Sequence, residues 1–327
     1  HYVARLEPGA EMPDIDIDLL NDKIGAAIRT WDEDFRDAAI REVGEEAAGP
    51  LVAAYGPAFS ISYKDDFEVA QGLADLRRLE LLEQPTDTEF ALYKPRSGDE
   101  AIRRFKLFRR EPISLTRVLP LFTHMGVEVV DERPYELTRA DGTPMYVYDF
   151  GLRAPADDLW DSMSHAELRE LFEGAIDAVW NNRAESDPLG ALVLRAKLTW
   201  RQVVILRAIT KYVRQTQSRF SENYIVSALV HNKDIAADLV ALFEARFDPD
   251  RAHEGREEAE EEIAARIQAA LDDVSSLDED RILRSCLGVI RAALRTNHFQ
   301  LGPDGEGKDY FSIKLDPTKV PDLPQPR

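Results

Sequence analysis

A cluster of basic side chains occupies positions 103 to 110 of a chain that is otherwise acidic. The cluster comprises Arg103, Arg104, Lys106, Arg109 and Arg110. Because a guanidinium group binds a carboxylate through two parallel hydrogen bonds, the cluster could form an anion site for a carboxylate effector. The alternative, which we favour, is that these cations neutralise the chain's own acids or contact another subunit.

Several motifs resemble catalytic sites but lack a required residue. Segment 302–308 has phosphate-loop spacing, yet Asp309 stands where Ser or Thr would bind magnesium, and a strand is expected to follow where a helix is needed. The Asp-Phe-Gly sequence at 149–151 lacks the other kinase motifs. The acidic residues at 14–18 are followed by Leu19, where a calcium loop requires glycine.

The remaining chemistry-bearing residues also form no recognisable site. The six histidines have no zinc-ligand spacing, and the single cysteine, Cys286, lies in an apolar helical pattern typical of a buried thiol. We therefore expect no catalytic, cofactor-binding or metal-binding residue in this chain. One cysteine allows no intrachain disulfide and is consistent with a cytoplasmic location.

Charge and length limit the possible partners. The 327 residues include 41 basic and 61 acidic side chains, which gives a net charge of −20. This charge disfavours nucleic acid and anionic membranes as partners, and no apolar run reaches the ~18–20 residues that span a bilayer. The first residue is not Met and the end is rich in Pro, so we expect a fragment of a longer protein.

The elements that must position these residues are clearest at 113–153. Ser114 is a candidate N-cap, Gly126 ends the helix, and Asp141-Gly142 is the dipeptide favoured in a tight hairpin turn. Strands are expected before this unit, at 89–94 and 101–109. Two helices are expected before these strands, at about residues 19–48 and at 67–82, with breaks between them at Gly49-Pro50 and Gly56-Pro57.

The second half is predicted to be almost entirely helical. Capping boxes begin helices at Ser164, Thr199 and Ser276, each with Glu or Gln three residues later. The basic series Arg207, Lys211 and Arg214 has helical spacing and is expected on a solvated face. The fold class is therefore α+β and predominantly helical, with a small α/β module followed by an all-α domain.

Four runs of sequence carry a family resemblance. They are RRFKLFRREPISLTRVLPLFTHMGVEVVDERPYEL with VYDFGLR, LTWRQVVILRAITKYVRQTQSRFSENYI, LDEDRILRSCLGVIRAALRTNHFQ, and FSIKLDPTKVPDLPQPR. These runs, from about Phe90 to Arg327, resemble the large-subunit bacterial NAD-specific glutamate dehydrogenases. The resemblance implies the N-terminal, non-catalytic region just before the catalytic domain, with an ACT-like module and helical motifs.

The resemblance implies an organisation for the whole chain. Residues 1–18 would end a preceding module, 19–85 form a helical segment, 86–155 the ACT-like module, 156–300 the helical domain, and 301–327 a strand and Pro-rich linker toward the catalytic domain. The usual ACT order is β-α-β-β-α-β. A second helix is expected at 164–180, but a final strand is not evident after it. We expect the strand at 89–94 to fill that place in the sheet.

The resemblance also implies a function and partners. The full-length protein would oxidise L-glutamate to 2-oxoglutarate with NAD, and this segment would contact its own catalytic domain and other protomers of a homo-oligomer. A pocket for an amino-acid effector is expected where a strand end meets a helix start, at Arg110, Glu111, Ser114, Gly126 and Val127. The alternative is a protein-interaction module without a small-molecule effector.

Overall fold

The computed structural model describes residues 16, 29–96, 98–156, 159–216, 218–251, 254–303, 305–320 and 323. The preceding module expected at 1–18, apart from residue 16, and most of the Pro-rich end lie outside these residues. The chain divides into two compact units. The first comprises His1–Glu89, Phe108–Glu111 and Pro134–Val147, and the second comprises Phe90–Leu107, Pro112–Arg133 and Tyr148–Arg327.

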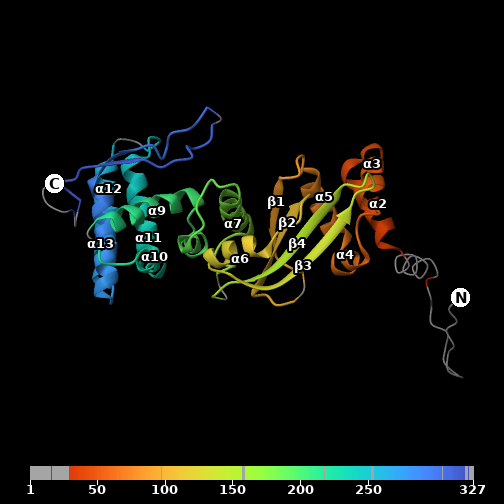
Figure 1. The fold of residues 1–327 in the computed structure, drawn as a ribbon, viewed down its shortest axis with the longest axis horizontal. Helices are drawn as coiled ribbons and strands as arrows, with labels where there is room; N and C mark the ends of the chain where they lie inside the picture. Colours follow the sequence, from red (N-terminus) through yellow and green to blue (C-terminus); the bar gives the residue numbers. More distant parts are fainter. Residues whose placement is uncertain are drawn as a thin grey trace, which may run out of the picture. The chain divides into compact units, whose positions relative to one another are not determined.

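The first unit contains short helices (Figure 1), and aromatic side chains pack against one another in it. The helices are α2 (Trp31–Val43), α3 (Glu45–Tyr55), α4 (Ile61–Asp66) and α5 (Val69–Glu80). Trp31 stacks on Phe35, and Tyr63 meets the ring of Tyr135 edge-on. The break expected at Gly49-Pro50 is wrong, because α3 runs through both residues and the helices separate at Gly44, whose φ is +83°.

A four-stranded antiparallel sheet has the order β1-β2-β4-β3. Its strands are β1 (Thr88–Tyr93), β2 (Ile102–Arg109), β3 (Glu128–Thr138) and β4 (Pro144–Arg153), which confirms all four expected strands. The hairpin turn has Gly142 at φ +87°, and Asp141 accepts a hydrogen bond from the amide of Thr143. In a split βαβ fold the strand after the second helix lies beside the first strand. Here β1 occupies that place beside β2.

Two helices of the second unit cover one face of the sheet, as Figure 1 shows. They are α6 (Leu115–His124) and α7 (His165–Trp180). The ring of Phe105 on β2 lies 5.4 Å from Phe122 of α6 and 5.6 Å from Phe172 of α7, measured between ring centroids. Phe122 also lies 5.2 Å from Phe150 of β4. These contacts form the core of the expected α/β sandwich.

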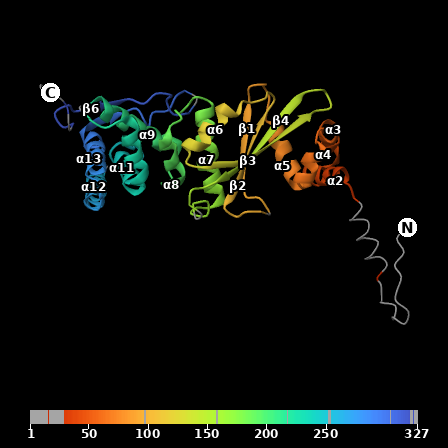
Figure 2. The same ribbon diagram turned by 60° about the horizontal axis from the view of Figure 1, so that its bottom comes forward.

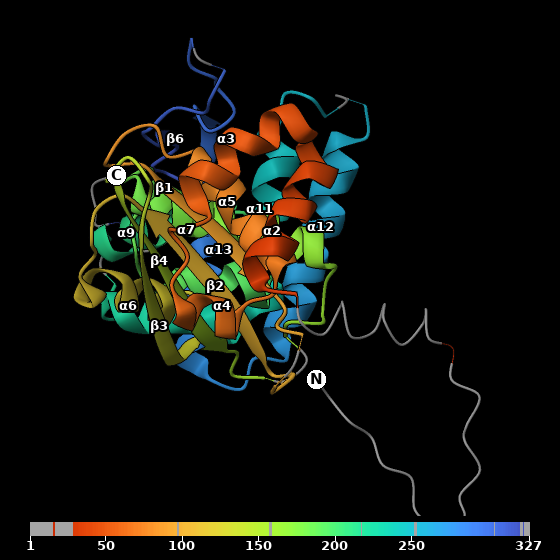
Figure 3. The ribbon, with the colours of Figure 1, turned by 90° about the vertical axis from the view of Figure 1, so that its right-hand side faces the viewer.

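The rest of the second unit is mainly helical. Its elements are the 3-10 helix η1 (Pro188–Ala191), α8 (Leu192–Arg195), α9 (Trp200–Gln215), α10 (Glu222–His231), α11 (Lys233–Phe247), α12 (Arg256–Asp272), α13 (Leu277–Ala292), β5 (Ala293–Thr296) and β6 (Ile313–Leu315). Helices α11 and α12 lie side by side in Figures 2 and 3. Thr199 and Gln202 form the complete capping box expected at the start of α9.

Strand β5 is the element that the sequence pattern missed. The chain was expected to remain helical to about residue 300, but β5 begins directly after α13 and pairs antiparallel with β6.

Cys286 on α13 is fully buried, as expected. Within the described part of the chain, no helix combines the length and apolar character that crossing a bilayer requires.

Candidate functional site

The basic cluster of β2 pairs with acids of the same chain. Arg104 donates to Asp131 at 2.7 Å and to Asp149 at 3.1 Å, and Arg103 donates to Asp161 at 2.7 Å. Asp149 is buried, and this burial raises the pKa of its carboxyl despite the opposing effect of Arg104. For these two arginines the structure therefore confirms the alternative that they neutralise the chain's own acids.

The other members of the cluster are also engaged locally. The ammonium of Lys106 is fully buried and lies 5.4 Å from the centroid of the Tyr93 ring. Arg109 pairs with Glu111 at 3.7 Å, and Arg110 donates to the carbonyl of Glu83 at 3.1 Å. Two residues of the predicted effector pocket, Arg110 and Glu111, thus already have partners within the first unit.

The structure does not bring together the remaining residues of that pocket. Ser114 is the N-cap of α6, but its hydroxyl bonds to the Thr116 hydroxyl at 2.7 Å and caps no backbone amide. Gly126 and Val127 follow the opposite end of the helix. Ten helical residues at ~1.5 Å each separate the two ends by about 15 Å. A single small ligand at a helix start therefore cannot touch both groups, and effector binding stays a prediction.

The C-terminal end of α6 is covered by η1. Gly126 has φ +76°, and a Cβ built on it would lie 3.0 Å from the Cβ of Ala191. A Cβ on Gly190 would lie 3.0 Å from the carbonyl oxygen of His124. Gly126 is favoured by its positive φ and by this contact, and at Gly190 a side chain would press on the His124 carbonyl. Gly126, a residue of the predicted pocket, thus packs against Ala191 of η1.

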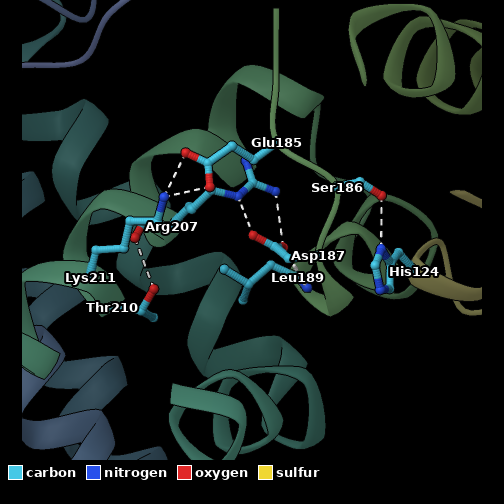
Figure 4. Close-up of polar contacts among 8 residues, drawn as sticks. All are labelled: His124, Glu185, Ser186, Asp187, Leu189, Arg207, Thr210 and Lys211. Carbon is cyan, nitrogen blue, oxygen red and sulfur yellow. Dashed lines mark hydrogen bonds and ion pairs between the residues drawn. The ribbon is translucent and has the colours of Figure 1, made fainter. Parts of the chain in front are cut away.

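Polar contacts join α6 to α9 through the segment between α7 and η1 (Figure 4). We call the four residues His124, Ser186, Asp187 and Arg207 the α6–α9 joint. The Nδ1 atom of His124 lies 2.8 Å from the hydroxyl of Ser186. Asp187 accepts hydrogen bonds from the Nε and Nη2 atoms of Arg207, the second at 3.0 Å. Asp187 also caps η1 by accepting from the Leu189 amide at 3.0 Å.

The position of Arg207 corrects one sequence expectation. Arg207 is only 7 % exposed, so it does not lie on a solvated face. Lys211, one turn further along α9, does face solvent, and its ammonium lies 2.6 Å from Oε1 of Glu185. Arg214 is exposed as expected. The helical spacing correctly placed these residues on one face, but Asp187 covers that face at Arg207.

A small cavity lies at the joint. Its volume is about 20 Å³, and its lining includes His124, Met125, Ile176, Asp187 and Trp200. This space holds about one water molecule, whereas a small-molecule site usually needs hundreds of Å³. Sequence reasoning missed the joint because its central ion pair links residues that are 20 positions apart. The one local signal was Asp187 followed by Pro188, a typical helix start.

Four family models match consecutive parts of the chain. They are glutamate dehydrogenase helical motif 2 at residues 38–82, the ACT3 domain at 87–167, helical motif 3 at 184–249, and the bacterial NAD-glutamate dehydrogenase catalytic domain at 266–327. The sequence led us to expect the catalytic domain only after residues 301–327. The last match begins earlier, at residue 266. It includes α13 and both strands of the β5–β6 sheet.

Curated relatives match the chain along nearly its whole length. The NAD-specific glutamate dehydrogenase of Halomonas elongata is 35% identical over 97% of the chain, that of Pseudomonas aeruginosa is 33% identical over 99%, and that of Mycobacterium tuberculosis is 33% identical over 100%. The chain spans about a fifth of the length of these relatives, 19%, 20% and 21% in turn. The chain therefore belongs to the family of bacterial NAD-specific glutamate dehydrogenases.

Proposed function

We propose that this chain is a regulatory and assembly segment of an NAD-dependent glutamate dehydrogenase. The whole protein would convert L-glutamate and NAD to 2-oxoglutarate and ammonia, and NAD would bind outside the residues discussed above. The observation that carries the proposal is the α6–α9 joint. His124 lies in the ACT3 match, whereas Ser186, Asp187 and Arg207 lie in the match to helical motif 3.

The joint is suited to transmit a displacement. The backbones at Gly126 and Gly190 lie in close contact with η1 and with the end of α6, and Asp187 fixes η1 to α9 through Arg207. Close-packed contacts of this kind pass strain on because they cannot be compressed. A movement of the ACT3 module, or of a protomer bound to it, would therefore reach helical motif 3 through η1.

A second candidate function is an interaction module that binds no effector. It is favoured by the cavity of about 20 Å³ at the joint and by the coverage of Gly126, which together leave no room for an amino acid there. Calorimetric titration of the chain with common amino acids separates the two functions. Saturable heat supports the regulatory function, and no heat leaves the assembly role alone.

The assembly role is tested in the full-length enzyme with Gly126→Ala. We expect unchanged KM values for glutamate and NAD, but a changed oligomer distribution by light scattering or a changed response of the rate to amino acids. Gly174→Ala is the matched control, since Gly174 is helical and a Cβ on it would meet no atom within 4 Å. Equal behaviour of the two variants would contradict the coupling role.

The isolated chain should form no NADH from glutamate and NAD, and measurable turnover would overturn the segment assignment.

A further inference from the structure

Cationic and aromatic side chains gather at the first turn of α9. The guanidinium carbon of Arg183 lies 5.6 Å from the ring centroid of Trp200, and that of Arg201 lies 5.3 Å from it. Arg201 also donates to the carbonyl of His298 at 3.0 Å. These contacts hold the Arg201 side chain in one place, half-buried, beside the indole.

Gly307 and Lys308 bring a further cation to this place. A Cβ on Gly307 would lie 2.1 Å from the Arg201 guanidinium, so the glycine backbone rests directly on that group. Lys308 follows and is half-buried. Arg201 and Lys308 line one cleft, together with Trp200 and Tyr310. The cleft has a volume of about 30 Å³, which is room for about two water molecules, and so for two oxygen atoms of an anion.

Two of the three cations that line this cleft have no carboxylate partner within the described residues. No carboxylate of that part of the chain pairs with Arg201 or Lys308, and the acid that lines the cleft is Asp309. Arg183, in contrast, pairs with Asp177. The chain has a net charge of −20, so an anion reaches this cleft against an overall repulsion, and the two cations supply the local attraction. Burial, and then the charge of Arg201, lower the pKa of His298 to about 4, which fits a positive potential there.

We propose that this cleft binds a small oxyanion, a carboxylate or a phosphate group, through Arg201 and Lys308. The guanidinium offers paired donors to two oxygens of the anion, and the ammonium adds a point charge. Arg201 lies in the match to helical motif 3, and Lys308 lies in the match to the catalytic domain. A bound anion would therefore tie the two segments together. The proposal rests on the cleft alone and not on the regulatory role of the α6–α9 joint.

Calorimetry of the chain with inorganic phosphate and with L-glutamate tests the proposal. Both titrations are run at a constant ionic strength adjusted with chloride. A change in salt concentration would by itself change the screening of the charges in the cleft. We expect saturable binding of at least one anion, and the tighter one identifies the phosphate or carboxylate class. Arg201→Gln and Lys308→Gln should each weaken it about tenfold or more, as for the loss of one charge-assisted hydrogen bond.

Lys314→Gln is the matched control, because Lys314 is an exposed lysine of β6 that does not line the cleft. It should bind the anion as the unaltered chain does. If Arg201→Gln disturbs the loop, Lys308→Gln still decides, since removing a half-buried ammonium leaves the Arg201 contacts in place. The proposal is overturned if neither anion shows saturable binding, or if Lys308→Gln binds as tightly as Lys314→Gln.

Discussion

The ion pair between Asp187 and Arg207 leads to a prediction about which partner matters more. The Arg207 side chain is 8% exposed and the Asp187 side chain is 26% exposed. Asp187→Ala therefore leaves a buried guanidinium without its anion, whereas Arg207→Met leaves a carboxylate that water can reach. We expect the first change to destabilise the chain much more than the second.

The magnitudes follow from the contacts. Removing one partner of a buried pair costs ~3–5 kcal/mol, and the partial exposure of Asp187 lowers this to about 2–3 kcal/mol. Loss of the cap on the Leu189 amide adds about 1 kcal/mol. Asp187→Ala should thus cost about 3–4 kcal/mol, and Arg207→Met about 1 kcal/mol. The double variant buries no unpaired charge, so it should be more stable than Asp187→Ala alone by about 1–2 kcal/mol.

Urea unfolding followed by circular dichroism measures these differences, with the midpoint and the slope compared in each variant. If the two units unfold separately, the exchange rate of the Leu189 amide hydrogen measures the local stability of the joint. Lys211→Gln is the control, because it removes an exposed pair and should cost less than about 0.5 kcal/mol. A double variant at least as unstable as Asp187→Ala would refute the reasoning.

Three further predictions concern single residues. Gly126→Ala should cost about 1–3 kcal/mol in urea unfolding because of its positive φ and the contact with Ala191, and a neutral result would contradict the tight packing. Burial raises the pKa of Cys286 to about 12, so the native chain at pH 8 should react with a thiol reagent only after denaturation. The pKa of His298, lowered to about 4, means that only the unfolded chain gains a proton as the pH falls from 6.5 toward 4. The free energy of unfolding should decrease over that window, and an NMR titration midpoint near 6.5 would argue against it.

Local sequence signals predicted most elements correctly. The capping box at Thr199 and the Asp-Gly turn at 141–142 depend on neighbouring residues only, so they were readable in advance. Only one of the two hydrogen bonds of the capping box expected at Ser276 is present. Ser276 accepts from the Glu279 amide, but the Glu279 carboxylate bonds to His231 and Asn232, where α10 meets α11. Strand β5 escaped prediction for a similar reason, since its conformation is set by pairing with β6 about 20 residues later.

The functional contacts were harder to predict than the elements. Helical spacing shows which side chains share a face, but not whether another segment covers that face, and so Arg207 was expected in solvent. The effector pocket combined residues near both ends of α6, because each end has features that suit an anion or a tight turn. The ten-residue length of that helix keeps the residues at its two ends apart. For Arg103, Arg104 and Arg109 the preferred interpretation of the basic cluster is confirmed, because each pairs with an acid of the same chain.

Helix α9 connects the two places on which our proposals rest. Arg201 lies in the anion cleft and Arg207 lies in the α6–α9 joint, six residues or about 9 Å further along the same helix. A helix of this length moves as a rigid body, so a shift of η1 against Arg207 must also shift Arg201 against Gly307. If both proposals hold, anion binding and the stability of the joint are linked, and linkage is reciprocal. Asp187→Ala should then weaken binding of the anion identified by calorimetry, whereas Lys211→Gln, on the same helix but in solvent, should not.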